Sequence, residues 1–238
     1  MQIIPYGESA LLLNFEQEID PEINRLVQSW EARIRAAKLS GLSHFIPAYA
    51  SLTLVFEQPL PQVKQTIEEI RQLADQPAAD HEQGQRQLRI PVCYADPFAL
   101  DKAQVMDLLE LDWPEVIEWH TQSAFQVYML GFSPGFAFMG RLPKALHIAR
   151  KREPRLTVPA RSVGLAGAQT GIYPNEIPGG WQLIGRTPIS PFRPMQEDIF
   201  LFQAGDQVQF YSIDEEEYNR LQTQIEQQQF DWSSLQQK

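Results

Sequence analysis

The first eighty residues alternate between short apolar runs and stretches with helical spacing. A helix is predicted over 21–39, because Asp20-Pro21 is a typical helix start and apolar residues follow at intervals of three and four. Residues 45–56 predict a strand, and a second helix is predicted from Pro61 onward. The apolar helix positions are Ile23, Leu26, Val27, Trp30, Ile34 and Ala37, then Val63, Ile67, Ile70 and Ala74. With one or two strands over 3–15, this order predicts a small sheet covered by two helices.

A polar stretch without periodicity, residues 76–87, predicts a boundary between two domains, 1–84 and 88–238. After a strand, two short helices and another strand, the second domain consists of short β-prone segments separated by turns. The strand candidates are 88–94, 124–130, 156–158, 162–165, 169–173, 181–185, 199–203 and 207–213, and a last helix is predicted over 214–229. This pattern is typical of a β-barrel or a β-sandwich, so the expected fold class is α+β.

The stretch Gly131–Pro188 differs from the rest of the chain in composition. It holds 9 of the 13 glycines, and 8 Lys and Arg residues against 2 acidic ones, in a chain whose net charge is −10. Glycines allow a backbone to approach a ligand closely, and a local excess of cations attracts anions. The stretch therefore predicts a site for a small anion such as a carboxylate, a phosphate or a nucleotide. The alternative is a solvated basic surface beside ordinary turns.

The overall composition excludes several classes of protein. Hydrophobic residues make up 43% and charged residues 21% of the chain, as in an ordinary globular protein. The acidic net charge of −10 argues against a nucleic-acid binder, and no apolar run approaches the ~18 residues of a membrane helix. The first residues lack the basic region of a signal peptide, and the single Cys93 fits a reducing compartment. A cytoplasmic location is therefore expected.

Three familiar kinds of catalytic motif do not fit the sequence. Residues 131–135 read Gly-Phe-Ser-Pro-Gly and match the nucleophile elbow of serine hydrolases, but Pro134 has no N–H to donate to an oxyanion. No phosphate-binding P-loop motif is present. The four histidines, His44, His81, His120 and His147, lie too far apart for the usual ligand spacings, so no metal site is predicted.

Two residues at the edges of the glycine-rich stretch have side chains suited to catalysis. His120 precedes the strand that leads into the stretch and is a candidate acid–base group. A packed histidine at a helix end is the alternative for that position. Arg186 has a planar guanidinium that suits a carboxylate or a phosphoryl group.

Five further residues within the stretch are candidates for ligand binding. Gln169 and Tyr173 share one face of a predicted strand, because side chains alternate with a period of two. Gly179 and Gly180 can bring backbone N–H groups against an anion, with Trp181 as a wall beside them. Hairpin turns around a core tryptophan would account for the same residues without a ligand.

Three sequence blocks resemble a known family. LGFSPGFAFMG (130–140), PRLTVPARSVGLAGAQTGIYP (154–174) and PGGWQLIGRTP (178–188) are similar to the family of the 5-oxoprolinase B-subunit, the kinase inhibitor KipI and allophanate hydrolase subunit 1, which has the carboxyltransferase subdomain C and D. This chain has Arg161 and Ala168 where the family usually has glycine. Arg161 would either reshape the pocket that the family resemblance implies or add a cation to it.

The resemblance implies a small α/β, ferredoxin-like N-terminal domain followed by a cyclophilin-like β-barrel. It also implies a cytoplasmic hetero-oligomer in which the chain works with a paralogous C-subunit and with an A-subunit of the LamB/YcsF type, and is inactive alone. The implied reaction is that of a bacterial 5-oxoprolinase, in which 5-oxoproline, ATP and water give glutamate, ADP and phosphate. ATP would be shared with a partner subunit, and no metal ligands are expected.

For the site, the resemblance combined with the residue types gives two groups of expected roles. Catalytic roles are expected for His120 and Arg186. Substrate or anion binding is expected for Arg161, Gln169, Tyr173, Gly179, Gly180 and Trp181. Two alternatives remain open at the level of sequence. One is a KipI-like inhibitor that binds a sporulation-type histidine kinase, and the other is a component related to urea carboxylase or allophanate hydrolase.

Overall fold

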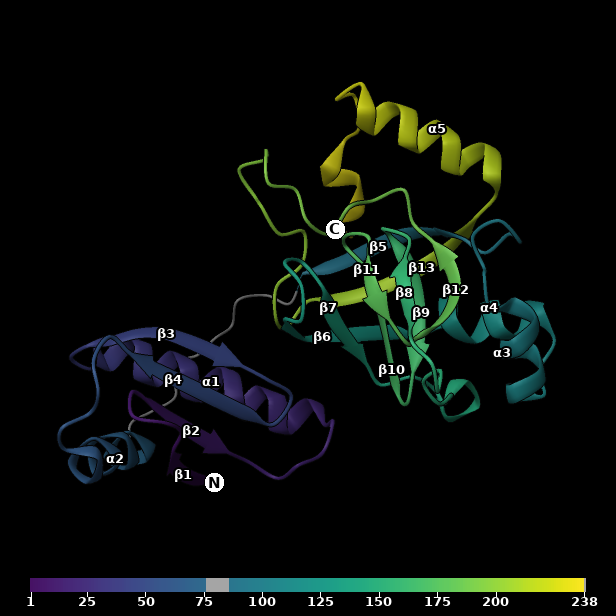
Figure 1. The fold of residues 1–238 in the computed structure, drawn as a ribbon. Coiled ribbons are helices and arrows are strands. Elements are labelled where there is room, and N and C mark those ends of the chain that lie inside the picture. The colour runs from purple at the N-terminus through teal and green to yellow at the C-terminus, as the bar shows by residue number, and fades with distance from the viewer. Residues whose placement is uncertain (76–85, 238) are drawn as a thin grey trace. The chain divides into compact units, whose positions relative to one another are not determined.

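A computed structural model of the chain describes residues 1–75 and 86–237. The chain forms two compact units, Met1–Gly84 and Gln85–Lys238 (Figure 1). Most of the stretch that was expected to separate two domains, residues 76–85, lies outside the described residues, as does His81.

The N-terminal unit is a four-stranded antiparallel sheet with two helices packed against it (Figure 1). The sheet has the order β1-β2-β4-β3. Its elements are β1 (Gln2–Pro5), β2 (Ala10–Asn14), α1 (Pro21–Ala37), β3 (Leu42–Pro47), β4 (Ser51–Phe56), α2 (Val63–Gln72) and the short 3-10 helix η1 (Leu73–Asp75). Helix α1 begins where predicted, because the Asp20 carboxylate accepts a hydrogen bond from the Glu22 backbone N–H at 2.8 Å. Its buried face packs with alternate residues of β2 and β4 into one core.

The elements of this unit follow one another as ββαββα. The ferredoxin-like arrangement implied by the family resemblance has the order β-α-β-β-α-β, so the observed unit differs by having two strands before its first helix. The cause is local, since Gly7 has a φ of 75° and the turn around it folds residues 2–14 into the antiparallel hairpin β1–β2.

The second unit is built on a closed seven-stranded barrel with the order β10-β7-β6-β13-β5-β12-β9, which confirms the expected α+β fold with a β-barrel (Figure 1). The barrel strands are β5 (Gln87–Cys93), β6 (Ala124–Leu130), β7 (Ala137–Gly140), β9 (Ser162–Ala166), β10 (Gln169–Ile172), β12 (Gln182–Arg186) and β13 (Gln207–Ile213). All neighbouring strands are antiparallel except β13 and β5, which run parallel. A separate ribbon pairs β8 (Arg155–Val158) with β11 (Ile177–Gly179).

Three helices and two 3-10 turns surround the barrel. They are α3 (Lys102–Leu109), α4 (Trp113–Gln122), α5 (Glu215–Glu226), η2 (Lys144–Leu146) and η3 (Trp232–Leu235). Helix α4 packs against β13, α3 lies next to β12, and α5 lies next to β5. Asp112 and Glu115 form a capping box at the start of α4, and Asp214 caps α5.

The predicted strand over 199–203 does not form. Phe200 makes only an isolated bridge to Phe192, and the following Leu201 and Phe202 are buried in the barrel core. The apolar run that predicted a strand therefore serves to anchor an irregular segment on the barrel. Pro191 and Pro194 in the facing segment have no N–H for a longer ladder.

Candidate functional site

A cavity of about 320 Å³ opens beside the Gly179–Gly180 turn of the barrel unit, and we call it the glycine-turn pocket. Four of the predicted binding residues line it, namely Tyr173, Gly179, Gly180 and Trp181. The other lining residues are Phe132, Phe136, Phe138, Arg150, Lys151, Pro154 and Pro178. The pocket thus combines aromatic walls, glycine backbone and two cations, which are groups suited to a small organic anion.

Phe136 lies at the centre of the aromatic wall. Its ring meets Tyr173 at 5.2 Å, Trp181 at 5.4 Å and Phe132 at 5.7 Å between ring centroids, each at an angle near 90°. Each edge-to-face pair of aromatic rings stabilises the fold beyond the contribution of its buried apolar surface. Phe132 remains 70% exposed at the outer edge of this cluster. The wall is therefore rigid around Phe136 and open to solvent at Phe132.

Gly179 packs directly on the phenol of Tyr173. A Cβ atom built on Gly179 would lie 2.6 Å from Cε1 and 2.8 Å from Cζ of that ring, which real structures do not allow. Burial raises the pKa of Tyr173, although a hydrogen bond from the Trp181 backbone and the charges of Arg150 and Arg155 act in the opposite direction. Tyr173 is therefore a neutral hydrogen-bonding group at neutral pH.

The two cations of the glycine-turn pocket differ in what they bind. The Lys151 ammonium donates to the Asp101 carboxylate at 2.8 Å and to Gln104 at 2.5 Å, while its backbone N–H donates to the Gly180 carbonyl at 2.7 Å. Arg150 is exposed and forms no ion pair or hydrogen bond within residues 1–75 and 86–237. The positive charge available to a ligand in this pocket is therefore that of Arg150.

Asp101 holds the cationic segment against the barrel. Its carboxylate accepts from Arg155 at 2.6 and 2.9 Å, from Lys151, and from the backbone N–H of Leu183 in β12 at 2.8 Å. Burial alone would raise the pKa of Asp101, but the hydrogen bonds from Arg155, Leu183 and Lys151 outweigh it and hold the pKa below its ordinary value. Sequence reasoning missed this residue, because Asp101 is placed like an ordinary helix start.

Three predicted residues lie away from the glycine-turn pocket. Arg186 stacks over Phe98 at 5.4 Å, and Arg161 donates from Nη1 to the Pro188 carbonyl at 3.1 Å. Gln169 lies in β10 between β7 and β9 and does not line the pocket. Arg186, Arg161 and Gln169 are thus not among the residues that line the glycine-turn pocket, and the roles expected for them stay predictions. The Arg161 backbone N–H donates to the carbonyl of Tyr173, which does line the pocket.

His120 lies in the interior of the barrel unit, so the proton-transfer role expected for it does not fit the structure. Its side chain is 0% exposed, its ring stacks on Phe210 at 4.6 Å, and both nitrogens are hydrogen-bonded, Nδ1 to the Tyr94 hydroxyl at 2.7 Å and Nε2 to the Thr170 hydroxyl at 3.0 Å. Burial lowers the pKa of His120 to about 3. The alternative, a packed histidine at a helix end, describes this residue.

The burial of neutral His120 predicts a stability that depends on pH. His120 takes up a proton near pH 6.5 in the unfolded chain but not in the folded chain. The free energy of unfolding is therefore highest above pH 6.5, and it decreases as the pH falls from there toward 3. Between pH 7 and pH 5 we expect this group to lower the free energy of unfolding by about 2 kcal/mol. Urea unfolding at several pH values measures it. The His120→Gln variant should lose this part of the pH dependence, and an unchanged dependence would contradict the assignment.

The described residues contain neither a group of metal ligands nor a helix suited to crossing a membrane. Within 1–75 and 86–237, no three or more His, Cys, Asp and Glu side chains are grouped so that they could hold a metal ion. In the same ranges, no helix has both the length and the apolar character needed to cross a membrane.

Comparison with known proteins gives consistent relatives. The family model of the carboxyltransferase domain, subdomain C and D, matches residues 1–202. The chain is 41% identical over 231 residues to the protein named as the B-subunit of 5-oxoprolinase in Bacillus subtilis (strain 168), covering 92% of this chain and 95% of that one. The protein of the same name from Escherichia coli O157:H7 is 36% identical over 206 residues, covering 86% of this chain and 92% of that one.

Solved structures also resemble this chain in both fold and sequence. The structure of TTHA0988 matches with a TM-score of 0.74 and 33% identity, over 86% of this chain and 40% of that chain. This chain thus spans less than half the length of that solved protein. The fold alone is also shared with the urea carboxylase of Kluyveromyces lactis, with a TM-score of 0.77 and 19% identity, over 96% of this chain and 23% of that chain. The chain therefore belongs to the family of the carboxyltransferase domain, subdomain C and D.

Proposed function

We propose that the chain is the B-subunit of a 5-oxoprolinase, a hydrolase that opens the lactam ring of 5-oxoproline to give glutamate. The observation that carries this proposal is the 41% identity to the 5-oxoprolinase B-subunit of Bacillus subtilis, which extends over 92% of this chain and 95% of that one. A match over nearly the full length of both chains supports a shared role better than a match to one domain would.

The glycine-turn pocket supports the proposal through its size and chemistry. 5-Oxoproline has a carboxylate, a compact ring and one amide group. In our proposal the carboxylate pairs with Arg150, the ring lies against Phe136 and Trp181, and the amide faces Tyr173 and the glycine turn. Donors directed at the lactam oxygen would stabilise the negative charge that develops there when the ring is opened.

ATP fits this pocket poorly. A triphosphate requires several cations, backbone N–H groups or a bound Mg²⁺, whereas the glycine-turn pocket offers Arg150 as its one cation without a partner in the described residues. We therefore propose that the nucleotide is held elsewhere in an assembly with a paralogous C-subunit and an A-subunit of the LamB/YcsF type. The lone chain would then be inactive, because the nucleotide would be bound outside it.

The proposal is tested by co-purifying the chain with the products of neighbouring genes. The assembled proteins are expected to release glutamate from 5-oxoproline only when ATP is supplied, and the isolated chain is expected to release none. A verified assembly that releases no glutamate would overturn the proposal. That outcome would favour the kinase-inhibitor alternative, which binding to a histidine kinase would then test.

The position of the substrate carboxylate is tested by a matched pair of variants in one segment. Arg150 lines the glycine-turn pocket, whereas the exposed Arg152 does not. We expect Arg150→Gln to raise the KM of the assembly for 5-oxoproline by about 10–100-fold, because a charge-assisted hydrogen bond contributes about 1.5–3 kcal/mol. Arg152→Gln should leave KM within about twofold. Equal effects of the two substitutions would show that only the net charge of the segment matters.

A further inference from the structure

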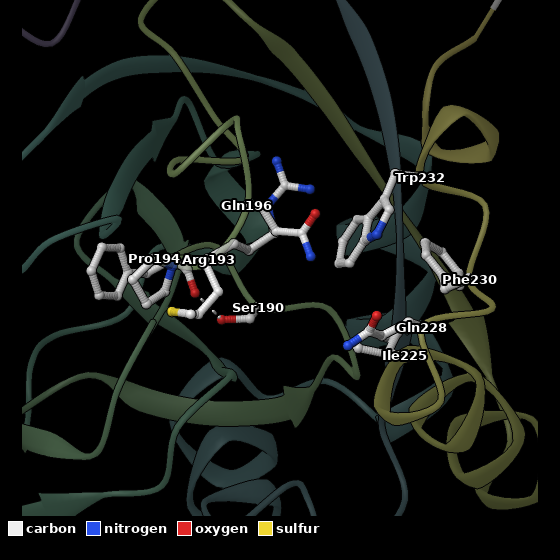
Figure 2. Close-up of a pocket in the computed structure, with 10 residues that line it drawn as sticks. Ser190, Arg193, Pro194, Gln196, Ile225, Gln228, Phe230 and Trp232 are labelled. Carbon is white, nitrogen blue, oxygen red and sulfur yellow. Dashed lines mark hydrogen bonds between the residues drawn. The ribbon is translucent and has the colours of Figure 1, made fainter.

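A second cavity of about 440 Å³ lies in the barrel unit between the segment 190–196 and the C-terminal residues 225–232, and we call it the C-terminal pocket (Figure 2). It is lined by Ser190, Phe192, Arg193, Pro194, Met195, Gln196, Ile225, Gln228, Phe230 and Trp232. None of these residues lines the glycine-turn pocket. One wall, residues 225–232, follows the range 1–202 that the family model matches, so the family domain alone does not form this pocket.

The apolar walls of the C-terminal pocket are fixed in place. The Trp232 ring meets Phe230 at 5.0 Å, and Phe192 stacks on Phe200 at 5.7 Å. The segment that carries Trp232 is tied to the barrel, because Leu235 is buried in the core and the Gln237 backbone N–H donates to the Gln87 carbonyl at 2.9 Å. The cavity is therefore formed before any ligand arrives, which lowers the entropic cost of binding.

Arg193 places a positive charge in this pocket without a matching negative one. Its guanidinium lies over the Trp232 ring at 4.5 Å, and its Nε is buried with no hydrogen-bond partner within the described ranges. No carboxylate among those residues lies within ion-pair distance of it, and the nearby Arg86 is itself paired with Asp206 at 2.6 Å. Burial lowers the pKa of Arg193, with the charge of Arg86 acting in the same direction and that of Asp198 opposing it. A bound anion would compensate this charge.

Two carboxamides lie in the same pocket and have no side-chain hydrogen bond within residues 1–75 and 86–237, namely those of Gln196 and Gln228. Figure 2 shows the guanidinium of Arg193 and the carboxamide of Gln196 directed from their segment toward Trp232, with Gln228 on the opposite wall. A primary carboxamide both donates and accepts, so it can pair with an amide of a ligand. Three polar groups thus surround one aromatic surface.

We propose that the C-terminal pocket is a second binding site, specific for a small organic carboxylate that has an aromatic body and an amide group. Arg193 binds the carboxylate, Trp232 and Phe230 hold the aromatic body, and Gln196 or Gln228 pairs with the amide. The volume lies within the range of small-molecule sites. The site is separate from the one proposed for 5-oxoproline, and it does not depend on that function.

The test uses N-acetyl-L-phenylalanine and its neutral C-terminal amide as probes in isothermal titration of the full chain. We expect saturable binding of the acid with a Kd of about 1 mM or tighter, and binding of the amide at least about tenfold weaker. Arg193→Gln should weaken binding of the acid at least about tenfold, because it removes the charge and keeps a polar side chain. Arg150→Gln, in the glycine-turn pocket, should leave the Kd unchanged.

Several results would overturn the proposal. They are equal binding of the acid and its amide, an unchanged Kd in Arg193→Gln, and the absence of saturable binding up to about 20 mM. A loss of binding in Arg150→Gln alone would place the probe in the other pocket. If Arg193→Gln does not fold, as judged by circular dichroism, Gln228→Ala on the exposed wall provides the second variant, and an unchanged Kd there would contradict the role of the carboxamide. Glutamate release by the assembly is measured separately, so failure of one proposal leaves the other intact.

Discussion

Replacing Asp101 with alanine is expected to lower the free energy of unfolding of the barrel unit by about 3–5 kcal/mol, because it leaves two largely buried cations without their counter-charge. The Asp101 carboxylate is buried and binds both Lys151 and Arg155, whose side chains are only 19% and 24% exposed. The same substitution also frees the Leu183 backbone N–H. Urea unfolding of the full chain, followed by tryptophan fluorescence, measures the change.

An exposed ion pair close to Asp101 in the sequence serves as the matched control. Asp96 pairs with Lys102 at 2.6 Å, but its side chain is 78% exposed. Asp96→Ala should therefore change the stability by less than about 1 kcal/mol. Because the pKa of Asp101 is held below its ordinary value, its contribution is present above pH 4 and lost as the pH falls through the folded pKa, a window lower than that of His120. Equal effects of the two alanine variants would contradict the anchoring role of Asp101.

Gly179→Ala is expected to lower kcat/KM of the assembled enzyme for 5-oxoproline by about 100-fold or more, since small displacements of a positioned group have effects of this size. The new Cβ would overlap the ring of Tyr173, which cannot move aside because it is 1% exposed and packed against Phe136 and Trp181. The aromatic wall of the glycine-turn pocket must then shift. Glutamate release by the co-purified proteins is the measurement.

The neighbouring glycine gives a control that differs by one position. A Cβ on Gly180 would find its nearest atoms, in Lys151 and Pro154, at 3.6 Å, which is an ordinary contact. Gly180→Ala should therefore keep kcat/KM within about twofold of the wild type. Retention of full activity by Gly179→Ala, with assembly verified, would show that the Tyr173 wall takes no part in the reaction.

The local parts of the fold could be predicted from the sequence. Asp20-Pro21 and the spacing of Trp30 and Ile34 located α1 to within two residues, because caps and periodicity act over a few positions. The number of short strands also predicted a barrel or a sandwich. The strand order could not be predicted, since the pairing of β5 with β13 depends on which distant segments bury each other's surface. The strand expected over 199–203 fails for a related reason, because Leu201 and Phe202 are buried in the barrel core without pairing in a sheet.

The candidate site was predicted in part for the same physical reasons. Tyr173 and the sequence Gly179-Gly180-Trp181 meet because the ribbon of β8 and β11 brings their segments together beside Phe136. Arg186 has a guanidinium suited to an anion, but it lies over the ring of Phe98. The periodicity of a sequence shows which face of a strand a side chain lies on, but it does not show which residues that face contacts. Asp101 could not be found from the sequence, because it is placed like an ordinary helix start and its partners Lys151 and Arg155 lie 50 and 54 residues further along the chain. No sequence feature distinguished buried His120 from an accessible one.

The parallel pairing of β5 with β13 has a consequence for the synthesis of the protein. The partners run from Gln87 with Gln207 to Cys93 with Ile213, so the barrel cannot close until the ribosome has released residue 213. The N-terminal sheet has all its strands within residues 2–56 and can form much earlier during translation. While the intervening residues are added, the nascent chain carries β5 and β6 with an open hydrogen-bonding edge where β13 will insert. Premature termination before residue 207 would leave that edge permanently exposed to aggregation and to cellular proteases.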